Sequence, residues 1–139
     1  MIKVFLLAWV LLFSGYGEPW RETKSFTLKK DEVAKILVKT TSPKQEKVFF
    51  WRWTLYTDKA LVVHESFDRF VGQHILNLEH HQSFRKRLLN AVKSEKDVPY
   101  AIVVFKKFDD VNKTAQFDLL LIDQEKRVIL DYLTKEEKH

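Results

Sequence analysis

Histidines are the residues in this chain whose type and grouping come closest to a chemical site. A transition-metal site needs three or four converging ligands, and carboxylates such as Glu65 or Glu79 could complete its shell. Against this, His74 lies on an apolar face, where a hydrogen-bonded core histidine is the commoner finding, and adjacent histidines on a strand point to opposite sides. A metal-binding protein is therefore an alternative hypothesis, and we expect no cofactor. The four candidate ligands are His64, His74, His80 and His81.

Three consecutive basic residues, Arg85, Lys86 and Arg87, form the second candidate site. Because their charges disfavour burial in either a helix or a strand, we expect them on the surface as a weak binding site for a protein or another component of the cell envelope. A basic patch can also make peripheral contact with anionic lipid headgroups, where each cation contributes about 1 kcal/mol. Tryptophans beside Arg52 could suggest a surface for single-stranded nucleic acid, but the export signal described below argues against a nucleic-acid partner.

Catalytic groupings are weak in this sequence. The chain has no cysteine, and none of its serines lies in a glycine-flanked elbow. His64, Glu65 and Ser66 are contiguous on one predicted strand, so their side chains cannot all converge. Asp109 and Asp110 are adjacent in a predicted turn, whereas glycoside hydrolysis requires two carboxyl groups facing each other across a cleft. The sequence therefore predicts a protein that is not an enzyme.

The first residues have the pattern of a secretory leader. Lys3 supplies a positive charge, residues 4–13 are an unbroken apolar run, and residues 14–17 place small side chains at the positions that a signal peptidase reads. We expect a signal peptide over residues 1–17, cleaved near Gly17, and a single β-rich domain over residues 18–139. An uncleaved anchor is an alternative, although ten apolar residues are about half of what a spanning helix needs. A buried first strand is another.

Composition narrows the compartment and the size of the core. The chain of 139 residues contains no cysteine, which excludes disulfides and a lipid-modified cysteine. An exported domain of this size without disulfides is more typical of bacteria, so we expect a periplasmic or secreted bacterial protein. The formal net charge of +5 is spread over mixed charges, which indicates a soluble surface before it indicates a polyanion site. About 120 residues after the leader are enough for one core.

Alternation of apolar and polar residues predicts a chain made mostly of strands. Residues 48–56 are the densest run, with Phe49, Trp51, Trp53 and Leu55 on one face and Tyr56 on the other. The short polar connection after this run predicts a hairpin with residues 60–65. The predicted strands are 25–28, 33–41, 48–56, 60–65, 70–78, 100–108, 115–122 and 128–133.

The fold class that follows is all-β, as an antiparallel β-sandwich or flattened barrel of about 7–8 strands. One short helix is compatible with it. Phe84, Leu88 and Val92 recur at four-residue spacing within residues 79–92, which slightly favours a helix over a strand.

The function expected from these observations is non-catalytic surface recognition of a protein or another cell-envelope component. The sequence leaves the partner, the strand order and the oligomeric state open. Exposed strand edges offer a physical route to such recognition, because an unpaired edge can accept the strand of another chain.

Overall fold

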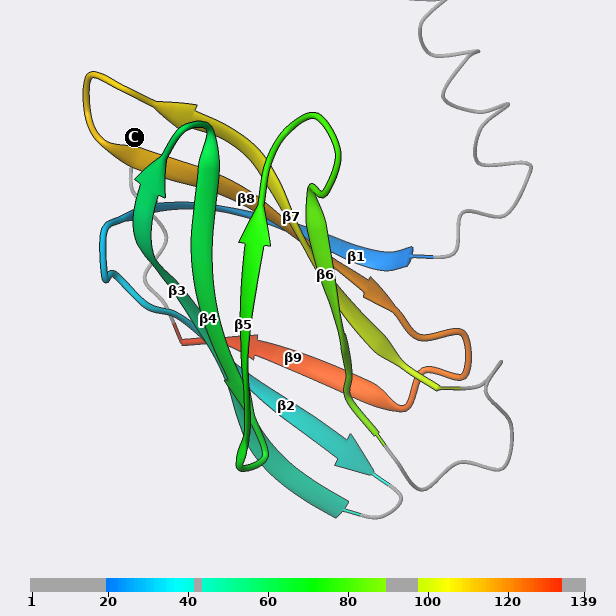
Figure 1. Ribbon diagram of the computed structural model, residues 1–139. Coiled ribbons are helices and arrows are strands. Elements are labelled where there is room, and N and C mark those ends of the chain that lie inside the picture. Colours follow the sequence, from blue (N-terminus) through cyan, green and yellow to red (C-terminus); the bar gives the residue numbers. More distant parts are fainter. Residues whose placement is uncertain (1–19, 42–43, 90–97, 134–139) are drawn as a thin grey trace, which may run out of the picture.

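A computed structural model describes residues 20–41, 44–89 and 98–133, which form nine strands and no helix (Figure 1). The predicted signal peptide, the end of the predicted helix beyond residue 89 and the charged tail after residue 133 lie outside the described residues. The described part contains no helix that could cross a membrane. The strands are β1 (Trp20–Lys29), β2 (Ala34–Thr41), β3 (Lys44–Thr57), β4 (Ala60–Phe67), β5 (Phe70–Leu76), β6 (Ser83–Arg87), β7 (Tyr100–Asp109), β8 (Thr114–Ile122) and β9 (Val128–Tyr132).

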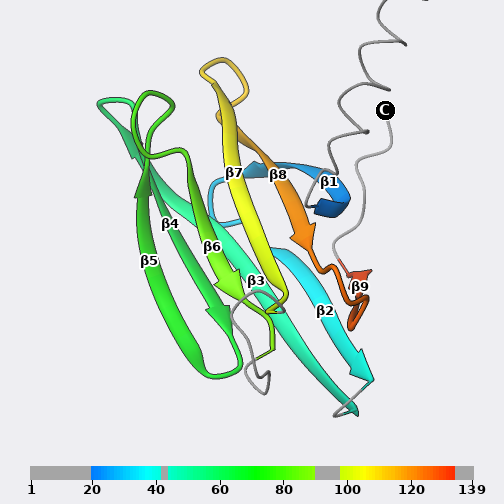
Figure 2. The same cartoon turned by 90° about the vertical axis from the view of Figure 1, so that its right-hand side faces the viewer.

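Two antiparallel sheets pack face to face. One has the strand order β1-β8-β7-β6 and the other the order β5-β4-β3-β2-β9. Figures 1 and 2 show the two layers. Side-chain contacts join β5 to β6 on one side of the molecule and β9 to β1 on the other. The fold is therefore a β-sandwich, and the predicted fold class is confirmed, with the sandwich rather than the flattened barrel.

Aromatic side chains of β3 form the centre of the core, as predicted. Trp51 is fully buried, and its ring centroid lies 5.2 Å from that of Phe26 on β1 and 6.1 Å from that of Phe117 on β8. Trp53 is also buried, and its indole Nε1 donates a hydrogen bond of 2.8 Å to the carbonyl oxygen of Leu28. These contacts join the two sheets, because β3 belongs to one and β1 and β8 to the other.

The end of β3 departs from the predicted pattern. The pairing of β3 with β4 shifts between Trp53 and Leu55, so one extra residue turns the faces of the strand over. Leu55 is consequently exposed, although the alternation placed it in the core. Tyr56 faces the interior instead, where its ring stacks on Phe108 at 3.8 Å. Period-two reasoning cannot see a bulge, because the extra residue leaves no mark in the apolar pattern.

The helix prediction is wrong for the part of residues 79–92 that the structure describes. Residues Ser83–Arg87 form strand β6, which pairs with β7 at the edge of its sheet. Phe84, Lys86 and Leu88 occupy one face at period two, and this face is turned to the core. Lys86 was consistent with the polar side of the predicted helix. It points inward instead, because Glu65 of the opposite sheet compensates its charge. The four-residue spacing of Phe84 and Leu88 fits either periodicity.

Several tight turns in the described part of the chain have residues other than glycine at positions with positive φ angles. Asp58 and Lys59 join β3 to β4 with φ angles of 50° and 65°, and the predicted hairpin is thereby confirmed. Two consecutive positive φ angles are typical of a type I′ turn, which prefers glycine at its second position.

We expect Lys59→Gly to raise the free energy of unfolding by about 0.5 kcal/mol, because relief of the left-handed strain exceeds the added entropy of the unfolded chain. Urea unfolding of the variant and the wild type measures the difference. Lys44→Gly, at an exposed position within β3, is the matched control and should lower stability. Equal destabilisation by both variants would contradict the prediction.

Candidate functional site

Strand β5 is an edge strand without a charged residue. The other edge strands of the two described sheets are β1, β6 and β9, and each carries at least one acidic or basic side chain. The sequence of β5 is Phe-Val-Gly-Gln-His-Ile-Leu. Natural proteins commonly protect edges with charges, prolines or bulges, because an exposed edge can pair with another chain. None of these devices is present in β5, whose pairing with β4 is continuous.

Apolar side chains of β5 are unusually exposed. Val71 is 81% exposed, Phe70 65% and Ile75 56%. Val71 and Ile75 point to the outer face of the sheet, on the side away from the core, with Gln73 between them. A row of large apolar groups on an unpaired edge indicates a contact surface more strongly than scattered single residues do.

The backbone of β5 presents free hydrogen-bonding groups to the open side. Phe67 and Phe70 flank the two-residue turn at Asp68 and Arg69, so they form a hydrogen-bonded pair of the antiparallel ladder. Alternate residues of β5 then bond to β4, and the residues between them direct N–H and C=O groups outward. No other strand in the described ranges pairs with that side. The outward-directed residues are Val71, Gln73 and Ile75.

A shallow groove of about 620 Å³ runs over the outer face next to this edge. Its lining includes Phe50 and Arg52 of β3, His64 of β4 and Val71 of β5. Arg52 lies opposite His64 in the strand register, and His64 lies opposite Gln73. The groove therefore combines an aromatic surface with a cross-strand row of polar side chains.

A buried ion pair lies beneath β5 on the inner face. The carboxylate of Glu65 on β4 is only 2% exposed, and the Lys86 ammonium on β6 lies 3.1 Å from each of its oxygens and donates a hydrogen bond to Oε1. Gly72 faces Glu65 across the β4–β5 ladder, and a Cβ at this position would overlap Glu65 Oε1. Absence of a side chain at residue 72 thus makes room for the carboxylate that joins the two sheets.

His74 completes this cluster. Its Nε2 lies 3.8 Å from Glu65 Oε1, and its ring stacks on Phe84 of β6 at 4.3 Å. Burial lowers the pKa of His74 below its ordinary value, and nearby Lys86 and His81 also lower it, while Glu65 acts in the opposite direction. The neutral imidazole is therefore favoured in the folded protein.

This shift makes stability depend on pH. The unfolded chain takes up a proton at His74 near the ordinary pKa of 6.5, and the folded chain does so only at lower pH. Stability from the neutral His74 is therefore present above pH 6.5 and is lost as the pH falls through the lower, folded pKa. We expect the wild type to lose more stability than His74→Gln between about pH 7.5 and about pH 5.5 in urea unfolding. Equal losses in the two proteins would contradict this assignment.

On the other side of the sandwich, side chains close the gap between β1 and β9. The Tyr132 hydroxyl on β9 donates a hydrogen bond of 2.8 Å to Glu22 on β1, and the Lys24 ammonium lies 5.2 Å from the Tyr132 ring centroid. Burial raises the pKa of Tyr132 above its usual range, with the Glu22 contact adding to this effect. These contacts link the edge strands β1 and β9 and distinguish that side from the apolar β5 edge.

The three basic candidates do not form one surface. Arg85 is exposed on the outer face of its sheet, where its guanidinium lies 5.0 Å from the Tyr100 ring centroid. Arg87 is only partly exposed, and its Nε atom is buried. Lys86 points the other way, and its side chain is 19% exposed. The expectation that all three lie on the surface is wrong for Lys86, because Glu65 provides the compensating charge inside.

The four histidines likewise do not converge on one point. His64 lies in the groove on the outer face, whereas His74 is on the inner face, where His81 is near enough to influence its pKa. Among the residues described, no three histidine, aspartate or glutamate side chains are grouped so as to hold a metal ion. The structure thus does not bring the proposed ligand set together.

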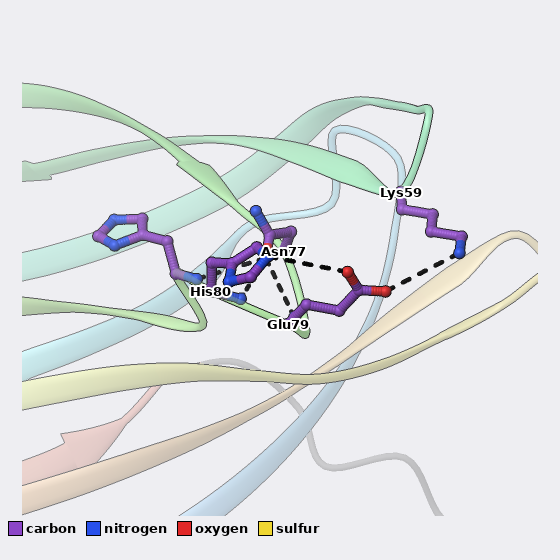
Figure 3. Close-up of polar contacts among 5 residues, drawn as sticks. Lys59, Asn77, Glu79 and His80 are labelled. Atoms are coloured by element: carbon purple, nitrogen blue, oxygen red, sulfur yellow. Dashed lines mark hydrogen bonds and ion pairs between the residues drawn. The ribbon is translucent and has the colours of Figure 1, made fainter.

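His80 and His81 belong to the connection between β5 and β6, which Asn77 organises (Figure 3). Asn77 Oδ1 accepts hydrogen bonds from the backbone N–H groups of Glu79 at 3.0 Å, His80 at 2.6 Å and His81 at 3.3 Å. This is a turn stabilised by a side-chain amide. It accounts for the loop conformation without a ligand.

Two residues of this site carried only weak signals in the sequence. Glu65 is an acidic residue at an inward position of an alternating strand, and Gly72 interrupts an apolar run where a close crossing is natural. Neither signal identifies the other as its neighbour. Their proximity follows from the register of β4 and β5.

Comparison with known proteins found no matching family model, no matching curated protein and no matching solved structure. The β5 edge and its surroundings are therefore the features of this chain that indicate a function.

Proposed function

We propose that this protein is a non-catalytic binding domain of the cell envelope that recognises another protein by adding a strand to β5. The observation that carries the proposal is the uncharged edge, with Val71 81% exposed and the backbone groups of alternate residues directed outward. Strand addition satisfies such groups through main-chain hydrogen bonds, which supply affinity without requiring one particular sequence.

The surface beside the edge supplies side-chain selectivity in this proposal. Successive side chains of an added strand point to opposite faces. Those on the outer face lie beside Val71 and Ile75 and continue the apolar row. A partner strand with β-branched or aromatic residues at alternate positions is therefore the chemistry that fits.

A binding role fits the titratable cluster better than catalysis does. Glu65 and Lys86 are paired between the sheets, and Glu65 is almost fully covered. A catalytic carboxylate must contact its substrate, and this one contacts the lysine and the histidine of its own fold. The arrangement supports a structural part for the cluster in holding the β5 edge in place.

Site-specific photo-crosslinking tests the proposal. We expect benzoylphenylalanine at Val71, in the protein expressed in its native cells, to form a defined adduct that mass spectrometry identifies. Gln73→Pro in the same chain should abolish the adduct, because proline removes an outward N–H group and leaves the bonds between β5 and β4 in place. The matched control is benzoylphenylalanine at Val111, which is 89% exposed in another region. An adduct pattern that is equal at both positions, or that survives Gln73→Pro, would refute strand addition.

The cellular address is a separate part of the proposal and rests on the amino-terminal pattern of the sequence. We propose that the chain is exported to the periplasm or secreted after cleavage near Gly17. Amino-terminal sequencing of the protein purified from its native cells should then begin at Glu18 or close to it. A sequence starting at Met1 would contradict cleavage.

A further inference from the structure

The sequence of β5 has an approximate two-fold pattern around its central residue. Gln73 has three strand residues on either side of it, which run from Phe70 to Leu76. Moving outward from Gln73, Gly72 corresponds to His74, Val71 to Ile75, and Phe70 to Leu76. Each outer pair joins two apolar residues, and the inner pair joins the residue without a side chain to a large ring. An antiparallel strand pair around a two-fold axis places such residues opposite one another.

We infer that the partner strand is β5 of a second copy of this chain, so that two sandwiches share one continuous sheet. This inference rests on the proposed function and names the partner of the same edge. Gln73 faces Gln73 of the second copy on the two-fold axis. A carboxamide group can donate and accept, so the two side chains complement each other.

The backbone groups agree with this register. The residues that direct N–H and C=O groups outward are Val71, Gln73 and Ile75. Pairing on Gln73 sets Val71 against Ile75 of the second copy, so outward-directed groups meet outward-directed groups along the whole strand. A shift by one residue would set them against residues already bonded to β4.

Side chains on both faces are also complementary. On the outer face Val71 and Ile75 of each copy form a four-residue apolar patch, in which cross-strand contacts reduce their exposure. On the inner face the His74 ring of one copy lies against Gly72 of the other, where no side chain obstructs it. Arg85, the exposed cation of β6, points to the outer face of the other sheet and does not enter the contact.

Charge does not oppose this pairing. β5 has no charge, so two copies do not repel each other along the contact. Beyond its ends, Arg69 is adjacent to Asp68, and Glu79 lies 3.9 Å from Lys59 of its own chain, so neither end presents an excess of one charge. Because one strand pair buries less surface than a standard interface, we expect reversible dimers with a Kd of about 1 to 100 µM.

Sedimentation velocity and oxidative crosslinking test the inference. The protein purified from its native cells should change from monomer to dimer between about 1 and 300 µM. Gln73→Pro and Val71→Lys should each raise the Kd at least about tenfold, whereas Val111→Lys should leave it unchanged. The chain has no cysteine, so Gln73→Cys introduces one thiol. Opposed Cα atoms of a hydrogen-bonded pair lie about 5.5 Å apart, within disulfide range, and Gln73→Cys should crosslink on oxidation.

Val71→Cys provides the register control. Its two thiols would lie four residues apart along the strand, about 13 Å, and should not crosslink. A dimer that persists in both Gln73→Pro and Val71→Lys would overturn the inference by placing self-association elsewhere. A protein that stays monomeric but forms a Gln73→Pro-sensitive adduct with a different protein at Val71 would overturn self-pairing and leave the proposed function standing. Absence of both dimer and adduct would overturn both.

Discussion

Lys86→Met is expected to lower the free energy of unfolding by about 3 kcal/mol, because it leaves the Glu65 carboxylate buried without its cation. The carboxylate is 2% exposed, so water cannot replace the ammonium that lies 3.1 Å away. Methionine has nearly the length of lysine, and the loss of packing is small. Urea unfolding of the variant and the wild type measures the change.

The double variant Glu65→Leu with Lys86→Met separates the charge effect from packing. Replacing both partners by apolar groups removes the unpaired charge, so its stability should return to within about 1 kcal/mol of the wild type. Arg85→Met is the matched control on the same strand, and it should cost no more than about 1 kcal/mol, because only the contact with Tyr100 is lost. A double variant as unstable as Lys86→Met would show that the fold requires these side chains for their shape.

Gly72→Ala is the second variant with a large expected effect, a loss of about 2 to 4 kcal/mol. The new Cβ would overlap Glu65 Oε1 and would approach His74 Nε2 to 3.3 Å. To accommodate it, the carboxylate must move away from Lys86, which disturbs a buried ion pair. Thermal and urea unfolding of the variant measure the loss.

Removal of the carboxylate provides the decisive control for Gly72→Ala. In a background of Glu65→Ala and Lys86→Met the clash is absent, so adding Gly72→Ala should cost less than about 1 kcal/mol. Gln73→Ala changes the next residue, whose side chain lies on the outer face, and it should have little effect on stability. An equal cost of Gly72→Ala in both backgrounds would show that the strain lies in the backbone of β5.

Much of the fold was predictable because a strand with one face in the core repeats every two residues. The alternation over residues 60–65 predicted β4, and the structure extends that strand to Phe67. The aromatic run around Trp51 predicted the central core strand, and it lies in the middle of the five-stranded sheet. Short polar segments between such runs predicted antiparallel hairpins.

The errors occurred where one residue depends on a distant partner or on an extra residue in the ladder. The sequence predicted that Lys86 faces solvent. Its side chain points inward, because Glu65, 21 residues away in sequence, compensates its charge. The alternation predicted that Leu55 lies in the core, and a bulge in β3 turns it outward. Neither outcome is encoded in the local pattern of apolar and polar side chains.

The sequence by itself determined most of the segments that become strands, with β6 as the exception, and that β5 carries no charge, since alternation and composition are local properties. Only the tertiary structure decided that β5 is an edge, that β6 stands next to it in the opposite sheet, and that Glu65, His74 and Lys86 meet between them. The reason is physical: strand order and facing partners are set by long-range packing of two sheets, in which residues far apart in the chain satisfy each other's charges and backbone groups.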